Sequence, residues 1–152
     1  VGPADIMNSY KLIFSGGTFS GNPLTMTAGA AILGYLKAHP EIYLHLAEQS
    51  DRLANEMNRF LQNENMEAQL MNAQSQFSFQ FTRKTIESAW DTKTITPRFP
   101  PNLFYAILHR NGVIIPGLHL FFITASHTAE DVDKVIGSMQ KSFLELREYG
   151  LI

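Results

Sequence analysis

Residues 15–24 read "SGGTFSGNPL" and combine small residues, hydroxyl groups and the start of a helix. Gly17 lacks a Cβ atom, so the backbone around it can approach a ligand closely. The hydroxyl group of Thr18 is a hydrogen-bond donor, and a helix that begins at Pro23 would present the positive end of its dipole nearby. Such a loop suits a bound phosphate. The alternative interpretation is an ordinary loop in which Asn22 caps the helix and no anion binds.

Histidine and lysine side chains are the other groups that could carry out chemistry. His119 lies in an apolar segment, and its side chain would titrate near neutral pH. It suits either a substrate site or a strand position that faces solvent, and both interpretations stay open. His127 precedes a helix and is interpreted as structural, while Lys11 is interpreted as an exposed, solvated lysine. The other three histidines are interpreted as surface or edge residues, and their spacing predicts no metal site.

Residues 83–100 form a mixed polar segment whose role the sequence does not determine. Arg83 and Arg98 in this segment have two possible roles. They could clamp a substrate carboxylate through bidentate hydrogen bonds. They could equally lie in solvent, which is the common position of an arginine in a polar loop.

The composition is that of a globular domain, with 152 residues of which 45% are hydrophobic and 17% are charged. The formal net charge is −2 and basic residues do not cluster, so non-specific nucleic-acid binding is not expected. Cysteine is absent, which excludes disulfides and thiolate metal sites and fits a reducing compartment. No apolar run reaches the roughly 18 residues that a membrane-spanning helix needs. We therefore expect a cytoplasmic protein that binds neither nucleic acid nor membrane.

The spacing of apolar residues predicts an alternation of helices and strands. Apolar residues recur at helical spacing over residues 23–39 and again over residues 43–61. The segment "QFSFQF" at residues 76–81 alternates phenylalanine with polar residues, which is typical of a half-buried strand. A short helix is predicted from Pro101, and Thr128 is the predicted cap of a final amphipathic helix.

Three further strand segments complete the predicted sheet. One begins at residues 68–70, and two more, at residues 113–115 and 118–124, are expected to form a hairpin that turns at Pro116 and Gly117. This order of elements fits an antiparallel sheet that helices cover on one face. The predicted fold is therefore α+β with two layers and a sheet of about three to four strands.

The segment "GGTFSGNPLTMTAGAAIL" resembles a motif of the class III pyridoxal-phosphate-dependent aminotransferases, which runs G-T-x-S-G-N-P-x-x-x-A into a helix. It is most similar to the glutamate-1-semialdehyde aminomutase branch. The segment "NGVIIPGLHLFFITASHTAEDVDKVI" resembles that branch's C-terminal strand, its Ala-His-Thr step and its Asp-rich helix start. The resemblance spans nearly the whole chain and is weakest over residues 62–100. It implies the small C-terminal domain of a fold-type-I enzyme, so that this chain would be a C-terminal fragment.

The resemblance also implies a cofactor, pyridoxal 5'-phosphate, and a homodimer. In the family, the threonine of the motif binds the phosphate of the cofactor held by the neighbouring subunit, and the matching residues here are Thr18 and the backbone of Gly17. Residues 1–21 would be this phosphate loop with a remnant of the large domain, and residues 22–152 would be the C-terminal small domain with its leading helices. The family's Schiff-base lysine precedes the matched stretch. We therefore expect it upstream of Val1, no catalytic residue within the chain, and no activity from the chain alone.

The resemblance leaves the substrate open. His119 stands where the aminomutase branch has an acidic residue near its active site, which favours an aminotransferase with another substrate over a semialdehyde mutase. The last strand also lacks the arginine that dicarboxylate-binding members often carry. The implied substrate is a small-molecule or carrier-bound amino or keto compound, and the enzyme could stand alone or belong to a larger biosynthetic assembly. The alternative is a non-catalytic α+β dimerisation or binding module that retains only the fold.

Overall fold

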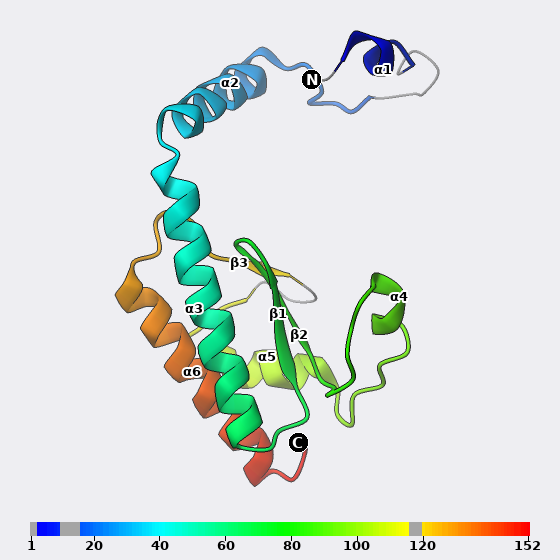
Figure 1. The fold of residues 1–152 in the computed structure, drawn as a ribbon, viewed down its shortest axis with the longest axis vertical. Helices are drawn as coiled ribbons and strands as arrows, with labels where there is room; N and C mark the ends of the chain where they lie inside the picture. The colour runs from blue at the N-terminus through cyan, green and yellow to red at the C-terminus, as the bar shows by residue number, and fades with distance from the viewer. Residues whose placement is uncertain (1–2, 10–15, 116–119) are drawn as a thin grey trace. The chain divides into compact units, whose positions relative to one another are not determined.

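A computed structural model describes residues 3–9, 16–115 and 120–152 of the chain (Figure 1). The chain divides into two compact units, Val1–Pro40 and Glu41–Ile152. The second unit holds the hydrophobic core and all the strands of the described residues. Within the described residues, no helix is both long enough and apolar enough to cross a membrane.

The first unit contains two helices, α1 (Ala4–Ser9) and α2 (Pro23–Ala38). The predicted helix start at Pro23 is confirmed, since Pro23 occupies the first turn. The side chain of Asn22 accepts a hydrogen bond from the backbone N–H of Leu24 at 2.9 Å. A proline needs no N–H partner at this position and the cap satisfies the next free donor, so the local sequence alone accounts for where the helix begins.

Helix α2 is apolar on all sides and buries none of its residues within the described chain. Most of its large apolar side chains are more than half exposed, and Leu36 is partly exposed. The more exposed ones are Leu24, Met26, Ile32, Leu33 and Tyr35. Lys37 in the last turn is its one ionisable side chain apart from tyrosine. A helix with apolar residues all round is normally buried, so α2 has the composition of an interior helix.

The second unit is built on a three-stranded antiparallel sheet in the order β1-β2-β3. The strands are β1 (Gln69–Ala73), β2 (Gln76–Gln80) and β3 (Phe121–Phe122). In the register, Leu70 lies opposite Phe79 and Phe77 lies opposite Phe121. The predicted alternation is confirmed, because Phe77 and Phe79 are buried while the serine between them is partly exposed.

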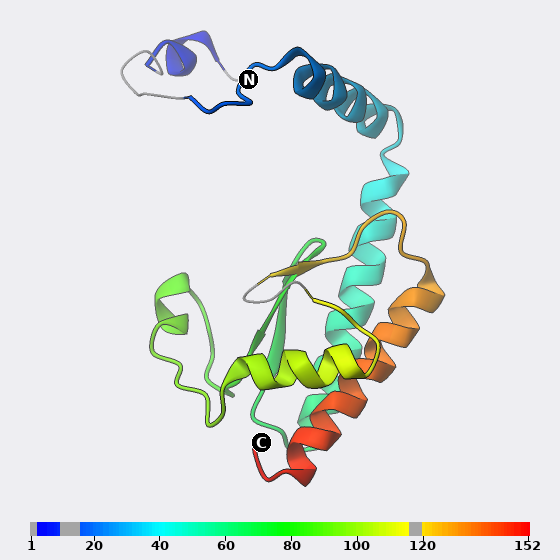
Figure 2. The ribbon, with the colours of Figure 1, turned by 180° about the vertical axis from the view of Figure 1, so that it is seen from behind.

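Three long helices pack on the face of the sheet that carries the phenylalanines. They are α3 (Glu41–Asn63), α5 (Pro101–Arg110) and α6 (Ala129–Glu148), and Figures 1 and 2 show them around the sheet from opposite sides. A one-turn helix, α4 (Ala89–Thr92), lies in the mixed polar segment at residues 83–100. Helices on one face of an antiparallel sheet make this an α+β fold, as predicted.

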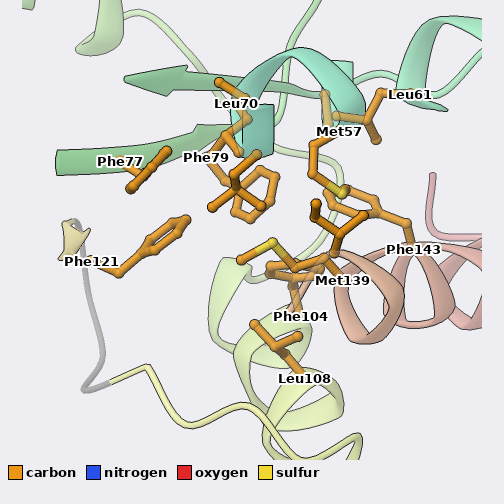
Figure 3. Close-up of a cluster of buried hydrophobic side chains, with 14 of the residues drawn as sticks. Met57, Leu61, Leu70, Phe77, Phe79, Phe104, Leu108, Phe121, Met139 and Phe143 are labelled. Atoms are coloured by element: carbon orange, nitrogen blue, oxygen red, sulfur yellow. The ribbon is translucent and has the colours of Figure 1, made fainter. Parts of the chain in front are cut away.

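Aromatic rings from four elements meet in the core of the second unit. The ring of Phe79 lies 5.0 Å from that of Phe104 on α5, 5.3 Å from Phe143 on α6 and 5.8 Å from Phe121 on β3, between ring centroids. Figure 3 shows these rings converging with Met57 and Met139 from the helices. Edge-to-face and offset ring pairs at such distances add stability beyond the area they bury. Phe79 of β2 therefore joins the sheet to both α5 and α6.

A single amide side chain satisfies the backbone at the β1 edge of the sheet. Asn58 on α3 donates from Nδ2 to the carbonyl of Leu70 at 2.8 Å and accepts from the N–H of Leu70 at 2.7 Å. These groups lie on the side of β1 without a partner strand, where unpaired N–H and C=O groups would otherwise be exposed. The side-chain amide of Asn58 thus takes the place of one residue of a neighbouring strand and connects the β1 edge to α3.

The predicted hairpin at the C-terminal strands is the main correction to the expected fold. Residues 113–115 form no strand, and of the described part of the second predicted strand, residues 120–124, only Phe121–Phe122 joins the sheet. The predicted turn at residues 116 and 117 lies outside the described residues. The backbone N–H of Val113 donates to the carbonyl of Leu108 at 3.1 Å, so it closes the end of α5 and does not enter a ladder of strands.

Candidate functional site

The candidate anion loop precedes α2 in the first unit. The backbone N–H of Ser20 donates to the carbonyl of Gly17 at 2.9 Å, and the N–H of Asn22 donates to the carbonyl of Phe19 at 3.2 Å. Gly21 has φ +71°, a left-handed conformation that glycine adopts without strain. Two successive turns therefore deliver the chain to the helix start, and the glycine allows the second one.

The hydrogen-bond donors of this loop indicate which ligand it could bind. Within the described residues, neither the backbone N–H nor the side-chain hydroxyl of Thr18 has a hydrogen-bond partner, and Thr18 is exposed. A Cβ atom at position 17 would lie 3.2 Å from Oγ of Ser20, so a side chain there would crowd the turn. The loop thus offers an amide, a hydroxyl and a close backbone approach beside a helix N-terminus. That donor set fits a phosphate group.

The structure brings together only part of the predicted site. Gly17 and Thr18 are neighbours in the loop and share its exposed side. His119 and Lys11 lie outside the described residues, and the site as described does not include them. Among the described residues, no group of three or more histidine, aspartate or glutamate side chains gathers to hold a metal ion.

The two arginines considered for carboxylate binding are both engaged within the second unit. Arg83 donates from its side chain to the backbone carbonyls of Met66 and Asn65. Arg98 forms an ion pair with Glu67, with 3.3 Å between Nε and the carboxylate. The geometry supports a structural role for Arg83, which connects the segment after β2 to the chain that precedes β1. The side chain of Arg98 is 78% exposed, so its position agrees with the alternative of an arginine in solvent, and its surface ion pair contributes little to stability.

His127 lies at the junction of β3 and α6, and its ring makes a specific set of contacts. The backbone N–H of Thr124 donates to Nδ1 of His127 at 3.0 Å, and the Thr124 hydroxyl lies 2.9 Å from the same nitrogen. Nε2 of His45 on α3 lies 3.3 Å from the backbone carbonyl of His127. A carbonyl only accepts, so His45 donates from Nε2. The interpretation of His127 as structural agrees with this geometry, and His45 is partly buried, which agrees with its interpretation as a surface or edge residue.

The cap of α6 is a reciprocal pair of hydrogen bonds, as the sequence predicts. The backbone N–H and the hydroxyl of Thr128 both donate to the carboxylate of Asp131, at 3.0 and 2.9 Å, and the hydroxyl oxygen accepts from the N–H of Asp131 at 3.2 Å. The hydrogen bonds from the Thr128 backbone and side chain lower the pKa of Asp131 below its usual range. The carboxylate therefore favours the folded chain only in its ionised form.

This cap predicts a pH-dependent contribution to stability. Because the pKa of Asp131 is lowered in the folded chain, the contribution is complete above the unfolded value of about 3.9 and is lost as the pH falls through the folded value. We expect Thr128→Ala to cost about 1 kcal/mol of unfolding free energy at pH 7 and less at pH 3. Urea unfolding at the two pH values measures the difference, and an equal cost at both would contradict the role of the carboxylate.

The sequence of the chain is similar to that of one group of enzymes. No protein-family model matches the chain. The chain is 32% identical over 138 residues to glutamate-1-semialdehyde 2,1-aminomutase 2 of Exiguobacterium sp., a match that covers 90% of this chain and 31% of the relative. It is 26% identical over 132 residues to glutamate-1-semialdehyde 2,1-aminomutase of Thermus thermophilus, with 86% and 31% covered. The chain thus spans about a third of the length of the curated relatives it matches.

Solved structures share the fold. A β-phenylalanine aminotransferase from Variovorax paradoxus matches with a TM-score of 0.78 and 23% identity over 97% of this chain and 35% of that chain. An omega-transaminase from Sphaerobacter thermophilus matches with a TM-score of 0.73 and 19% identity over 96% of this chain and 34% of that chain. At this level of identity the similarity shows a common fold and does not assign a substrate.

Proposed function

From the membership of this chain in the class III pyridoxal-phosphate-dependent aminotransferase family, we propose that it is the C-terminal part of an enzyme that transfers an amino group to a carbonyl substrate. The proposed cofactor is pyridoxal 5'-phosphate. When bound, this cofactor supplies the electron sink for the reaction, and the protein supplies binding and orientation. The aminomutase relatives and the transaminase folds both support this reaction class.

The observation that carries the proposal is the loop before α2. Thr18 has a free hydroxyl and a free backbone N–H within the described residues, and Gly17 leaves room for a close approach. We assign both residues to the cofactor phosphate, with the hydroxyl of Thr18 and the amides of the loop as donors. No basic side chain of the described residues lies within the loop, so these neutral donors would orient the phosphate while its charge is balanced elsewhere.

We further propose that the loop acts in a homodimer, on the cofactor held by the neighbouring subunit. The composition of α2 supports an assembly of this kind, since its apolar residues face outward on every side of the helix. A helix of this type requires cover by other protein, and it begins directly after the loop. Residues 1–21 would form the phosphate loop with a remnant of the large domain, and residues 22–152 the small domain, with α2 and α3 as its leading helices.

The proposed substrate remains a small-molecule or carrier-bound amino or keto compound. We keep His119 as a substrate-site candidate, on the ground that a neutral or titrating imidazole there would select differently from a fixed carboxylate. The Schiff-base lysine is proposed to lie upstream of Val1, in a longer polypeptide. This placement agrees with the share of the relatives that the chain covers, 31% of the aminomutase of Exiguobacterium sp..

The experiment that tests this function compares the 152-residue chain with a longer polypeptide that also includes upstream sequence. We expect the chain alone, mixed with pyridoxal 5'-phosphate, to show no transamination above background and no borohydride-stable adduct. We expect the longer polypeptide to bind the cofactor and to transfer amino groups. Mass spectrometry after reduction locates the modified lysine, with Lys11→Arg as the control variant. An adduct at Lys11, or a longer polypeptide that never binds the cofactor, would refute the proposal and favour the non-catalytic module.

A further inference from the structure

A hollow of 230 Å³ lies in the second unit between β3, residues 113–115 and the helices α3 and α6. We propose that it binds a compact, uncharged molecule that is mostly hydrocarbon and carries one carbonyl oxygen, which accepts a hydrogen bond from Nε2 of His127. The described residues that line it all belong to the second unit, and the proposed binding needs no pyridoxal 5'-phosphate. Its test is therefore independent of the proposed function.

The described walls of the hollow offer no partner to a charged ligand. Its deepest side chains, Leu53, Val132 and Met139, are at most 2% exposed. Ile114 and Phe122 at its rim are more than half exposed, so the described part of the rim is apolar and reaches solvent. Every side chain that lines it within the described residues is hydrocarbon or thioether, apart from one histidine. A carboxylate or ammonium group would lose its hydration here without a partner.

The contacts of His127 leave one donor for a ligand. A backbone N–H can only donate, so Nδ1 of His127 must accept the hydrogen bond from Thr124. In the neutral ring the proton then resides on Nε2, which has no partner within the described residues. His127 also lines the hollow. The ring is held by the Thr124 contacts and by its place between β3 and α6, so its single donor is oriented before a ligand arrives.

The volume limits the size of the ligand. An apolar cavity of about 150 Å³ accommodates benzene, whereas sites for drug-sized molecules begin at about 300 Å³. A hollow of 230 Å³ therefore fits one ring or a short branched chain with a single polar substituent. One donor in hydrocarbon walls selects an acceptor such as a ketone or aldehyde oxygen and disfavours groups that carry several polar atoms.

The test uses cyclohexanone and cyclohexane as probes, which have the same ring and differ by one carbonyl oxygen. Methyl NMR spectra of the 152-residue chain, recorded at pH 8, follow titration with each probe. We expect saturable shifts of the methyl groups of Val132 and Val135, which lie in the wall of the hollow, and none at Leu33 on α2. Absence of saturable shifts with both probes would overturn the proposed site.

Two variants separate the hydrogen bond from the apolar walls. His127→Asn keeps an acceptor for the Thr124 N–H, because Oδ1 of asparagine can take the place of Nδ1, but it removes the Nε2 donor. We expect it to weaken cyclohexanone binding about three- to tenfold and to leave cyclohexane binding unchanged. Val135→Phe fills the hollow and should abolish the binding of both probes. Unchanged cyclohexanone affinity in His127→Asn would refute the role of His127.

Discussion

Phe79→Ala is expected to lower the unfolding free energy of the chain by about 3–5 kcal/mol, the range for a large buried aromatic side chain replaced by alanine. Phe79 is 5% exposed, and its ring contacts the rings of Phe104, Phe121 and Phe143. The substitution therefore leaves a cavity where the sheet meets two helices. Domains of this size are stable by only about 5–15 kcal/mol. We therefore expect the variant to be unfolded in part at 37 °C.

Urea unfolding followed by circular dichroism measures this effect. Trp90→Ala is the matched control, since Trp90 belongs to the same unit but is 72% exposed, and its replacement should change the free energy by less than about 0.5 kcal/mol. Phe79→Leu keeps most of the volume and should cost clearly less than Phe79→Ala. Equal costs for Phe79→Ala and Trp90→Ala would show that the aromatic cluster does not hold the sheet to its helices.

Thr18→Ala is expected to weaken retention of pyridoxal 5'-phosphate by the longer polypeptide about 10- to 100-fold without unfolding it. The reason is the loss of one hydrogen bond to a charged group, which is worth about 1.5–3 kcal/mol. The side chain is exposed and makes no hydrogen bond within the described residues, so its removal should leave the fold unchanged. The dissociation constant of the cofactor, measured by equilibrium dialysis, gives the size of the effect.

Two further variants test whether the hydroxyl itself is responsible. Thr18→Ser keeps the hydroxyl and should retain most of the affinity. Thr27→Ala removes an exposed threonine hydroxyl within α2, outside the loop, and should leave the affinity unchanged. If Thr18→Ala also left the affinity unchanged, Thr18 would not contact the phosphate, although the assignment of the chain to its family would be unaffected.

Local sequence determined the elements whose signals lie within a few residues. Pro23 preceded by Asn22 set the start of α2, and Thr128 with Asp131 set the start of α6, because a cap is completed by residues at most three positions apart. The alternation around Phe79 likewise identified β2, since neighbouring side chains of a strand point to opposite faces. The loop around Thr18 that we propose to bind a phosphate is likewise a short run of residues.

Only the tertiary structure decided the features that depend on contacts between distant residues. Residues 113–115 have the composition of a strand, yet the N–H of Val113 closes α5 and, within the described residues, no strand pairs with them. Asn58 has the sequence context of an ordinary polar helix residue, and only the structure shows that its side chain pairs with Leu70 on β1. Only the structure likewise shows that His45 of α3 donates to the backbone carbonyl of His127, 82 residues away. In the last two cases the hydrogen-bond partner comes from another element. Spacing along the chain carries no information about which element that will be.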